Sequence, residues 1–189
     1  MASRVERYLA HLERLSGGAE AEYLRVGAHE GGPDLSAIVY RDQPEPGLLT
    51  ALTYGLSLGE HESWRLGRPE LCISVRSEDA AWGLAIADLA SRLAGACPFQ
   101  YGDTIDLGGP IVDGTTLSAF VVFAPSVLER EDYLDVLGAG EGAPPEHVVN
   151  IAGMYPIHES ERQYIRAEGL EAFWKQSWDP YDVQRAPAV

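Results

Sequence analysis

The sequence is poor in positive charge, and this shortage excludes one large class of function. Among its 189 residues, 14 are Lys or Arg and 29 are Asp or Glu, which gives a formal net charge of −15 at pH 7. Such a surface repels the phosphate backbone of DNA and RNA, so we expect no direct nucleic-acid ligand. The same acidity favours solubility, and it also speeds encounter with a basic protein. Both explanations of the charge remain open at this stage.

Long apolar runs are also missing. One of the longest, residues 117–125 (L-S-A-F-V-V-F-A-P), has about half of the roughly 18 residues that a membrane span needs. The first eight residues (M-A-S-R-V-E-R-Y) contain no apolar segment of the kind found in secretory signals. We therefore expect no membrane insertion and a cytoplasmic location.

Cysteine is scarce as well. Cys72 and Cys97 have a spacing that matches no metal-binding or redox motif, and each lies beside apolar residues. Buried free thiols are the simplest expectation, because a cytoplasmic location disfavours a disulfide.

The composition that remains is typical of a globular domain. Apolar residues make up 46% of the chain and charged residues 23%, and the length suits one hydrophobic core. We expect a single domain in which residues 1–47 form an N-terminal helix and hairpin and residues 48–178 form the core. Residues 179–189 include Pro180 and Pro187 and are predicted to be a flexible tail.

Helix and strand signals alternate irregularly along the chain. Ser3 and Glu6 form a capping box before a helical repeat that ends at Gly17 and Gly18. Strand patterns follow, the first two joined by turn residues 30–34, and later helices are predicted from a cap at Ser77 and over residues 159–176. The predicted strands cover residues 21–26, 35–41, 48–58, 70–76, 117–123 and 147–155. This order predicts the α+β class, with a mixed, mostly antiparallel sheet flanked by helices.

Two carboxylates in a glycine-rich segment are the first candidates for chemistry. Asp103 and Asp106 lie in residues 101–111, which contain no Lys or Arg to hold a phosphate. With Glu161 and a histidine they could serve as general acid and base, or the pair could hold a hard cation such as Mg²⁺. A structural turn explains the same residues more simply.

A second segment resembles a zinc motif but is incomplete. His158 and Glu159 begin an H-E-x-x pattern, and Arg162 stands where the second histidine would be needed. Glu159 and Glu161 fit the first turn of a helix, where the helix dipole favours acids. We therefore predict no catalytic residue, no metal and no cofactor.

The edge strands of the predicted sheet and two further surfaces are candidates for binding a protein. The segment 129–146 is rich in acids and reads as a short helix or surface loop. Its candidate contact residues are Glu129, Glu131, Asp132, Asp135 and Glu141. The aromatic group of Phe173, Trp174, Trp178 and Tyr181 is either an exposed patch or the packing of the last helix.

An ordered set of short motifs resembles the Suppressor of fused (SUFU) domain family over about residues 48–176. The pieces are Y-G-L-S at 54–57, E-L-C-I at 70–73, the helix around residues 82–93, G-D-T-I at 102–105 with Gly108 and P-I at 110–111, G-T at 114–115, and Y-P-I at 155–157 with Glu161, Gly169 and Leu170. No single piece is specific, but their order and spacing together are a strong signal.

The resemblance implies a SUFU-like mixed α+β core with no known catalysis. Its motif residues look architectural, since the glycines suit turns and Pro156 suits the junction of a strand with a helix. These residues are Gly55, Glu70, Gly102, Asp103, Gly114, Pro156, Glu161 and Gly169.

The resemblance also suggests the function. The animal member, similar to this chain only over its N-terminal half, clamps a transcription factor of the Hedgehog pathway, and we do not carry this role over because the second half of that clamp has no counterpart here. Bacterial stand-alone members are thought to be immunity proteins that neutralise a cognate polymorphic toxin. We expect a non-enzymatic binding domain of this type, with a protein partner that could be a basic toxin. The alternative is a small enzyme that uses Asp103, Asp106 and Glu161.

Overall fold

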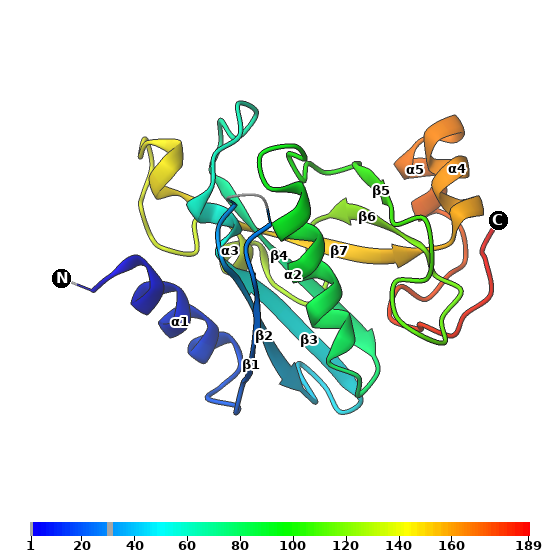
Figure 1. Cartoon of the computed structure of the whole chain (residues 1–189), viewed down its shortest axis with the longest axis horizontal. Helices are drawn as coiled ribbons and strands as arrows, with labels where there is room; N and C mark the ends of the chain where they lie inside the picture. Colours follow the sequence, from blue (N-terminus) through cyan, green and yellow to red (C-terminus); the bar gives the residue numbers. More distant parts are fainter. Residues whose placement is uncertain (1, 30–31) are drawn as a thin grey trace.

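The computed structural model describes residues 2–29 and 32–189, and within them the chain forms one seven-stranded sheet (Figure 1). Its strand order is β1-β2-β3-β4-β7-β6-β5, in which β4 and β7 run parallel and every other neighbouring pair is antiparallel. The strands are β1 (Glu22–Val26), β2 (Leu35–Arg41), β3 (Leu48–Tyr54), β4 (Arg68–Arg76), β5 (Thr104–Asp106), β6 (Ala119–Phe123) and β7 (Val149–Ile157). The predicted mixed, mostly antiparallel α+β fold is confirmed.

Helices cover both faces of this sheet. The helices are α1 (Arg4–Leu15), α2 (Ala81–Leu93), α3 (Arg130–Tyr133), α4 (Glu159–Glu168) and α5 (Leu170–Trp174), with 3₁₀ turns at Leu56–Leu58 and Pro145–His147. Figure 1 shows α2 crossing in front of the sheet, while α4 and α5 gather at the end away from α1. The N-terminal helix α1 packs on this sheet, and β1 and β2 are two of its strands.

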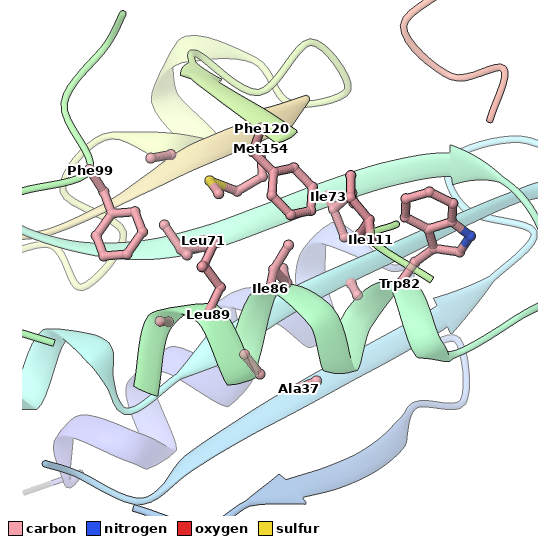
Figure 2. Close-up of a cluster of buried hydrophobic side chains, with 14 of the residues drawn as sticks. Ala37, Leu71, Ile73, Trp82, Ile86, Leu89, Phe99, Ile111, Phe120 and Met154 are labelled. Atoms are coloured by element: carbon pink, nitrogen blue, oxygen red, sulfur yellow. The ribbon is translucent and has the colours of Figure 1, made fainter. Parts of the chain in front are cut away.

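The main core lies between α2 and the sheet. Leu71 and Ile73 of β4 point toward Ile86 and Leu89 of α2 (Figure 2). Strand residues of opposite parity point to the other face, where Cys72 packs with the α1 side chains in a second core cluster. This alternation in β4 explains why its burial is almost continuous, since both of its faces are covered.

The first helix forms as its local sequence predicts. The Ser3 backbone N–H donates to Glu6 Oε2 at 2.6 Å, and the Glu6 N–H donates to Ser3 Oγ at 3.3 Å, which completes the capping box. Tyr8 then places its hydroxyl in the core, where it donates to the carbonyl of Thr53 at 2.9 Å. This bond ties α1 to the C-terminal end of β3.

Several predicted boundaries differ from the observed ones. The strand predicted over 48–58 ends at Tyr54 because Gly55 has φ +126°, and the helix predicted over 159–176 divides at Gly169, which has φ +92°. Ser77 does not cap α2, whose N-cap is Ala80. The last strand lies two residues later than predicted. Glu30 and Gly31, from the predicted 30–34 turn, lie outside the described residues.

The last eleven residues are packed rather than extended into solvent. The Arg76 N–H donates to the Tyr181 carbonyl at 2.8 Å, and Val183 is buried in the main core. Arg185 forms an ion pair with Glu161 of α4, and Ser160 Oγ donates to the Val189 carbonyl at 2.8 Å. We predicted a flexible tail from its two prolines, but these long-range contacts hold it on the domain.

In the described parts of the chain, no helix combines the length and the apolar character that crossing a membrane would require.

Candidate protein-interaction site

An open apolar groove lies at the end of the sheet where the parallel strands β4 and β7 begin. Its volume is about 610 Å³, and its base includes Pro69 of β4 with Ile151 and Ala152 of β7. In the described sheet, the pairing of β6 with β7 starts only at Phe123 opposite Gly153. The beginning of β7 therefore has β4 on one side and loop residues on the other, which leaves room for the groove.

Three loops form the walls of this groove, and side-chain hydrogen bonds hold them. The Trp64 indole N–H donates to the Pro98 carbonyl at 2.9 Å, which ties the loop before β4 to the loop after α2. Asn150 Nδ2 donates to the Leu66 carbonyl at 3.2 Å, and Asn150 Oδ1 accepts from the Asp135 N–H at 2.9 Å. One amide side chain of β7 therefore positions both the loop before β4 and the loop after α3.

Gly67 is required for this arrangement. Its φ is +131°, and a Cβ at this position would lie 2.6 Å from Asn150 Nδ2 and 2.8 Å from Val148 Cγ1. Because the backbone passes so close to β7, any side chain would displace the wall of the groove.

Large apolar side chains stand exposed around the groove. Leu66 is 89% exposed and Tyr101 is 50% exposed, and both line it. The Tyr101 ring lies 5.2 Å from Phe123, which lies 5.3 Å from Trp174, itself 37% exposed. The groove thus continues into an aromatic ledge, defined as Tyr101, Phe123 and Trp174. Exposed apolar surface of this kind, rich in Tyr and Trp, is typical of protein-binding sites.

An acidic recess adjoins the groove and shares Trp64 with it. This recess has a volume of about 400 Å³, and Glu60, Glu62 and Glu146 line it together with Arg68. The Glu60 side chain is almost fully exposed, and Arg68 Nη2 reaches its Oε1 at 3.5 Å. Three carboxylates against one guanidinium give the recess a negative charge.

The predicted acidic contact residues fall into two groups. Glu129, Glu131 and Glu141 are exposed around α3 and the loop that follows it. Asp132 forms an ion pair with Arg14 of α1 at 3.0 Å, and Asp135 accepts from the N–H groups of Ala139 and Gly140 at 2.9 and 2.8 Å. Asp135 also lines the groove. The exposed group stays a predicted contact surface, while Asp132 and Asp135 have structural partners.

The two aspartates of the alternative enzyme hypothesis hold backbone turns. Asp103 Oδ2 accepts from the Gln100 N–H at 2.8 Å, and Asp106 Oδ1 accepts from the Gly108 N–H at 2.8 Å. Asp106 also lies 3.4 Å from Arg162 of α4. Glu159, in the first turn of α4, accepts two hydrogen bonds from Arg162, and these hold the pKa of its carboxyl at about 2. Each of these groups therefore has a local structural partner.

Glu161 is fully buried and engaged on both oxygens. Its carboxylate accepts hydrogen bonds from both terminal nitrogens of Arg185. It also accepts from the backbone N–H groups of His158 and Ala188, both at 2.8 Å. Burial alone would raise the pKa of Glu161, but the hydrogen bonds from Arg185, Ala188 and His158 outweigh it and hold the pKa below its usual value. The carboxylate anchors the C-terminal tail.

Glu70 plays a similar part at the other end of the molecule. It is fully buried in β4 and accepts from Thr53 Oγ1 at 2.7 Å, the Gly55 N–H at 2.9 Å and the Ser57 N–H at 3.0 Å. Thr53 lies in β3, and the other two donors lie in the tight turn after it, where a Cβ on Gly55 would lie 2.4 Å from the Asp34 carbonyl oxygen. Glu70 and Gly55 therefore shape this turn together.

The remaining motif residues also stand at backbone junctions. Gly102 and Gly114 have φ of +96° and +83°, a region that favours glycine. Pro156 pairs with Phe120 near the end of β7, and His158 is the N-cap of α4. Within residues 2–29 and 32–189, no three His, Cys, Asp or Glu side chains gather as a metal site would need.

The aromatic group near the C-terminus is mostly packing. Phe173 is fully buried and lies 4.8 Å from Trp178, and Arg185 stacks over Trp178 at 4.7 Å from the ring centre. Trp174 is the member that reaches the surface, at the end of the aromatic ledge. Packing of the last helix therefore explains Phe173 and Trp178, while Trp174 contributes to an exposed patch.

The groove is the feature that sequence reasoning missed. Its one local signal is the loop S-W-R-L-G-R-P at 63–69, where Trp64 and Leu66 stand among polar residues with no helix or strand period. Isolated apolar residues in a loop carry no indication of what they contact. The groove itself arises from pairing between β4 and β7, which are far apart in the sequence.

The α+β fold and this exposed apolar groove are those of a protein-interaction domain, and comparisons with known proteins identify its family. Residues 31–186 match the family described as Suppressor of fused protein (SUFU), so the chain belongs to the SUFU family. This match begins earlier and ends later than the motif resemblance over residues 48–176.

Solved structures agree with this assignment. A SUFU homologue from Neisseria gonorrhoeae matches with a TM-score of 0.74 and 21% identity, covering 97% of this chain and 95% of that chain. The structure of the Sufu–Fu complex matches with a TM-score of 0.64 and 13% identity, covering 95% of this chain and 90% of that chain. Drosophila Suppressor of Fused matches with a TM-score of 0.63 and 13% identity, covering 95% of this chain and 50% of that chain. At these identities the likeness establishes the fold, and comparison with curated protein sequences found no match.

Proposed function

We propose that this chain is a non-enzymatic binding domain that holds a basic partner protein, in the manner of an immunity protein that neutralises a cognate toxin in the bacterial cytoplasm. The observation that carries the proposal is the groove, where Leu66 and Tyr101 stand exposed on a chain of net charge −15. Membership of a family that includes the Sufu–Fu complex supports binding of a protein.

Energetics favour a protein partner at this surface. Burying an apolar side chain of leucine size contributes about 1.5–3 kcal/mol, so an exposed Leu66 is a large unsatisfied contact. The exposed carboxylates around the groove would be costly to bury but act at a distance, where they speed the encounter with a basic protein. Apolar anchoring with electrostatic steering is the arrangement expected of a tight inhibitor of a basic enzyme, such as a nuclease.

The alternative of a small enzyme has less support. It requires Asp103, Asp106 and Glu161 to act on one substrate, and Glu161 is fully buried beneath the C-terminal tail. Asp103 and Asp106 each accept a backbone N–H in a turn. A catalytic carboxylate needs access to its substrate, so these placements do not favour the enzyme.

The proposal is tested by affinity purification of the tagged chain from its native cell, with the neighbouring open reading frames co-expressed. We expect a stoichiometric basic partner whose capture weakens at high salt, because salt screens steering charges. Co-expression should also protect cells from the toxicity of that partner. The proposal fails if no protein is recovered at either salt concentration and no neighbouring product is toxic.

A further inference from the structure

We propose that the groove and the acidic recess beside it form one binding site, which takes an extended segment of the partner that carries an apolar side chain close to a lysine or arginine. This inference rests on the proposed function and adds the chemistry of what is recognised. The groove would hold the apolar side chain and the recess the cation.

The two cavities are continuous in their lining. Trp64 borders both, and its indole N–H donates to the Pro98 carbonyl at 2.9 Å, which holds the ring between them. One side chain therefore separates an apolar from an acidic compartment. Three residues of an extended chain span about 10 Å, at roughly 3.3 Å per residue, so an occupant that passes Trp64 can reach both cavities with residues close together in its sequence.

The groove offers apolar contact with little competing polarity. Leu66, Phe99, Tyr101, Leu134 and Val148 face it, and its charged residue Asp135 is already engaged by backbone N–H groups. Leu66 and Tyr101 have the most surface left to bury. A partner side chain in this groove would contact apolar atoms from three separate loops.

The charge of the recess favours a partner segment that is positively charged. Glu60, Glu62 and Glu146 face it, and Arg68 is turned toward Glu60 and toward the Ser57 carbonyl at 3.4 Å. An acidic partner segment would be repelled here, whereas a lysine or arginine would meet carboxylates that are largely free in solution. This complementarity is the reason for choosing a basic protein segment over a second copy of this acidic chain.

The loop after α3 covers part of the beginning of β7. Residues 149–152 pair with β4 on one side, and on the other side the Val136 N–H donates to the Val149 carbonyl at 2.9 Å before the pairing with β6 begins at Gly153. An occupant of the groove would therefore contact β7 and this loop through side chains. An extended segment turns alternate side chains to one face, so residues close together in it can reach both cavities.

The test selects ligands from a phage-displayed library of random peptides about 8 residues long, which span roughly 26 Å when extended. We expect the retained peptides to carry Leu, Ile, Phe or Trp within about three positions of Lys or Arg. Their affinity is then measured by fluorescence anisotropy on the purified chain and its variants.

The variants separate the two compartments. Leu66→Ala with Tyr101→Ala should weaken binding by about 30-fold or more, as expected for hot-spot residues. Glu60→Gln, Glu62→Gln and Glu146→Gln together should weaken it about two- to tenfold and reduce its dependence on salt.

The control variants carry the same kinds of substitution at exposed residues outside the groove and the recess. Leu84→Ala with Tyr23→Ala removes two other exposed apolar side chains, and Glu13→Gln, Glu20→Gln and Glu78→Gln removes three exposed charges. Both control sets should bind like the wild type. Because every altered residue is exposed or lines an open cavity, the variants should fold, which thermal unfolding checks.

Three outcomes would overturn the inference. In the first, the library is screened without yielding a ligand, and in the second, the ligands it yields bind the groove variants and the control variants equally. The third outcome is that the chain forms a dimer, which the double substitution Leu66→Ala with Tyr101→Ala dissociates. If the partner from affinity purification is still held by the groove variants, this inference fails while the proposed function stands. If peptides bind in the groove but no cellular partner exists, the proposed function fails instead.

Discussion

The ion pair between Glu161 and Arg185 should be the strongest single contact of the C-terminal tail. Its side chains are 0% and 7% exposed, and Arg185 donates from both terminal nitrogens. Arg185→Ala would leave the Glu161 carboxylate buried with only the N–H groups of His158 and Ala188 as partners. Removing one member of a buried pair costs about 3–5 kcal/mol, because the remaining charge is uncompensated.

This loss is large enough to measure without ambiguity. For a chain of this size, each kcal/mol corresponds to about 2–4 °C, so Arg185→Ala should lower Tm by about 6–20 °C. Arg185 also stacks on Trp178 and bonds the Pro156 carbonyl at 3.3 Å, and these contacts place the expected loss in the upper part of the range. Thermal unfolding followed by circular dichroism gives Tm, and urea unfolding gives the free energy.

The double variant Glu161→Gln with Arg185→Met distinguishes the pair from the tail in general. It leaves no buried charge, so it should lose less stability than the sum of the two single variants. A loss below about 1 kcal/mol for Arg185→Ala would refute the reasoning, because the ion pair would then not hold the tail in solution.

Three further predictions follow from buried groups. The pKa of Glu161 is held below its usual value, so its stabilisation is present above the unfolded pKa of about 4.3 and disappears as pH falls through the folded pKa; between about pH 5 and 3 the wild type should lose more stability to urea than Glu161→Gln. Gly83→Ala should destabilise by about 1–3 kcal/mol in the same assay, despite the better helix propensity of alanine, because its Cβ would lie 2.9 Å from Ala51 Cβ and from Val39 Cγ2. Burial raises the pKa of Cys72 to about 12, so in Cys97→Ser a thiol reagent should react only after unfolding, and rapid reaction in the native state would contradict its burial.

Local signals in the sequence were enough for much of the fold. The capping box at Ser3 and Glu6 and the glycine pair that follows define α1, because both act within a few residues. Alternating apolar residues and turn residues likewise located the strands. Boundaries were less certain where one glycine decides them, as at Gly55 and Gly169, because a positive φ is visible only in the structure.

The tail and the groove depend on contacts between distant segments. Glu161 looked like an acid in the first turn of a helix, and only the fold brings Arg185 to it. The groove exists because β6 ends at Phe123 while β7 begins four residues before their pairing starts. No local pattern encodes where two strands stop pairing, so the exposed Leu66 had no assigned role.

The central claim is that this domain binds a protein through the groove beside β7. The most direct measurement is co-purification of the partner from cells that co-express the neighbouring open reading frames, using the wild type, the groove pair Leu66→Ala with Tyr101→Ala, and the control pair Leu84→Ala with Tyr23→Ala. We predict a stoichiometric partner with the wild type and the control pair and its loss with the groove pair. Equal recovery with both pairs, or recovery with none of the three proteins, would contradict the claim.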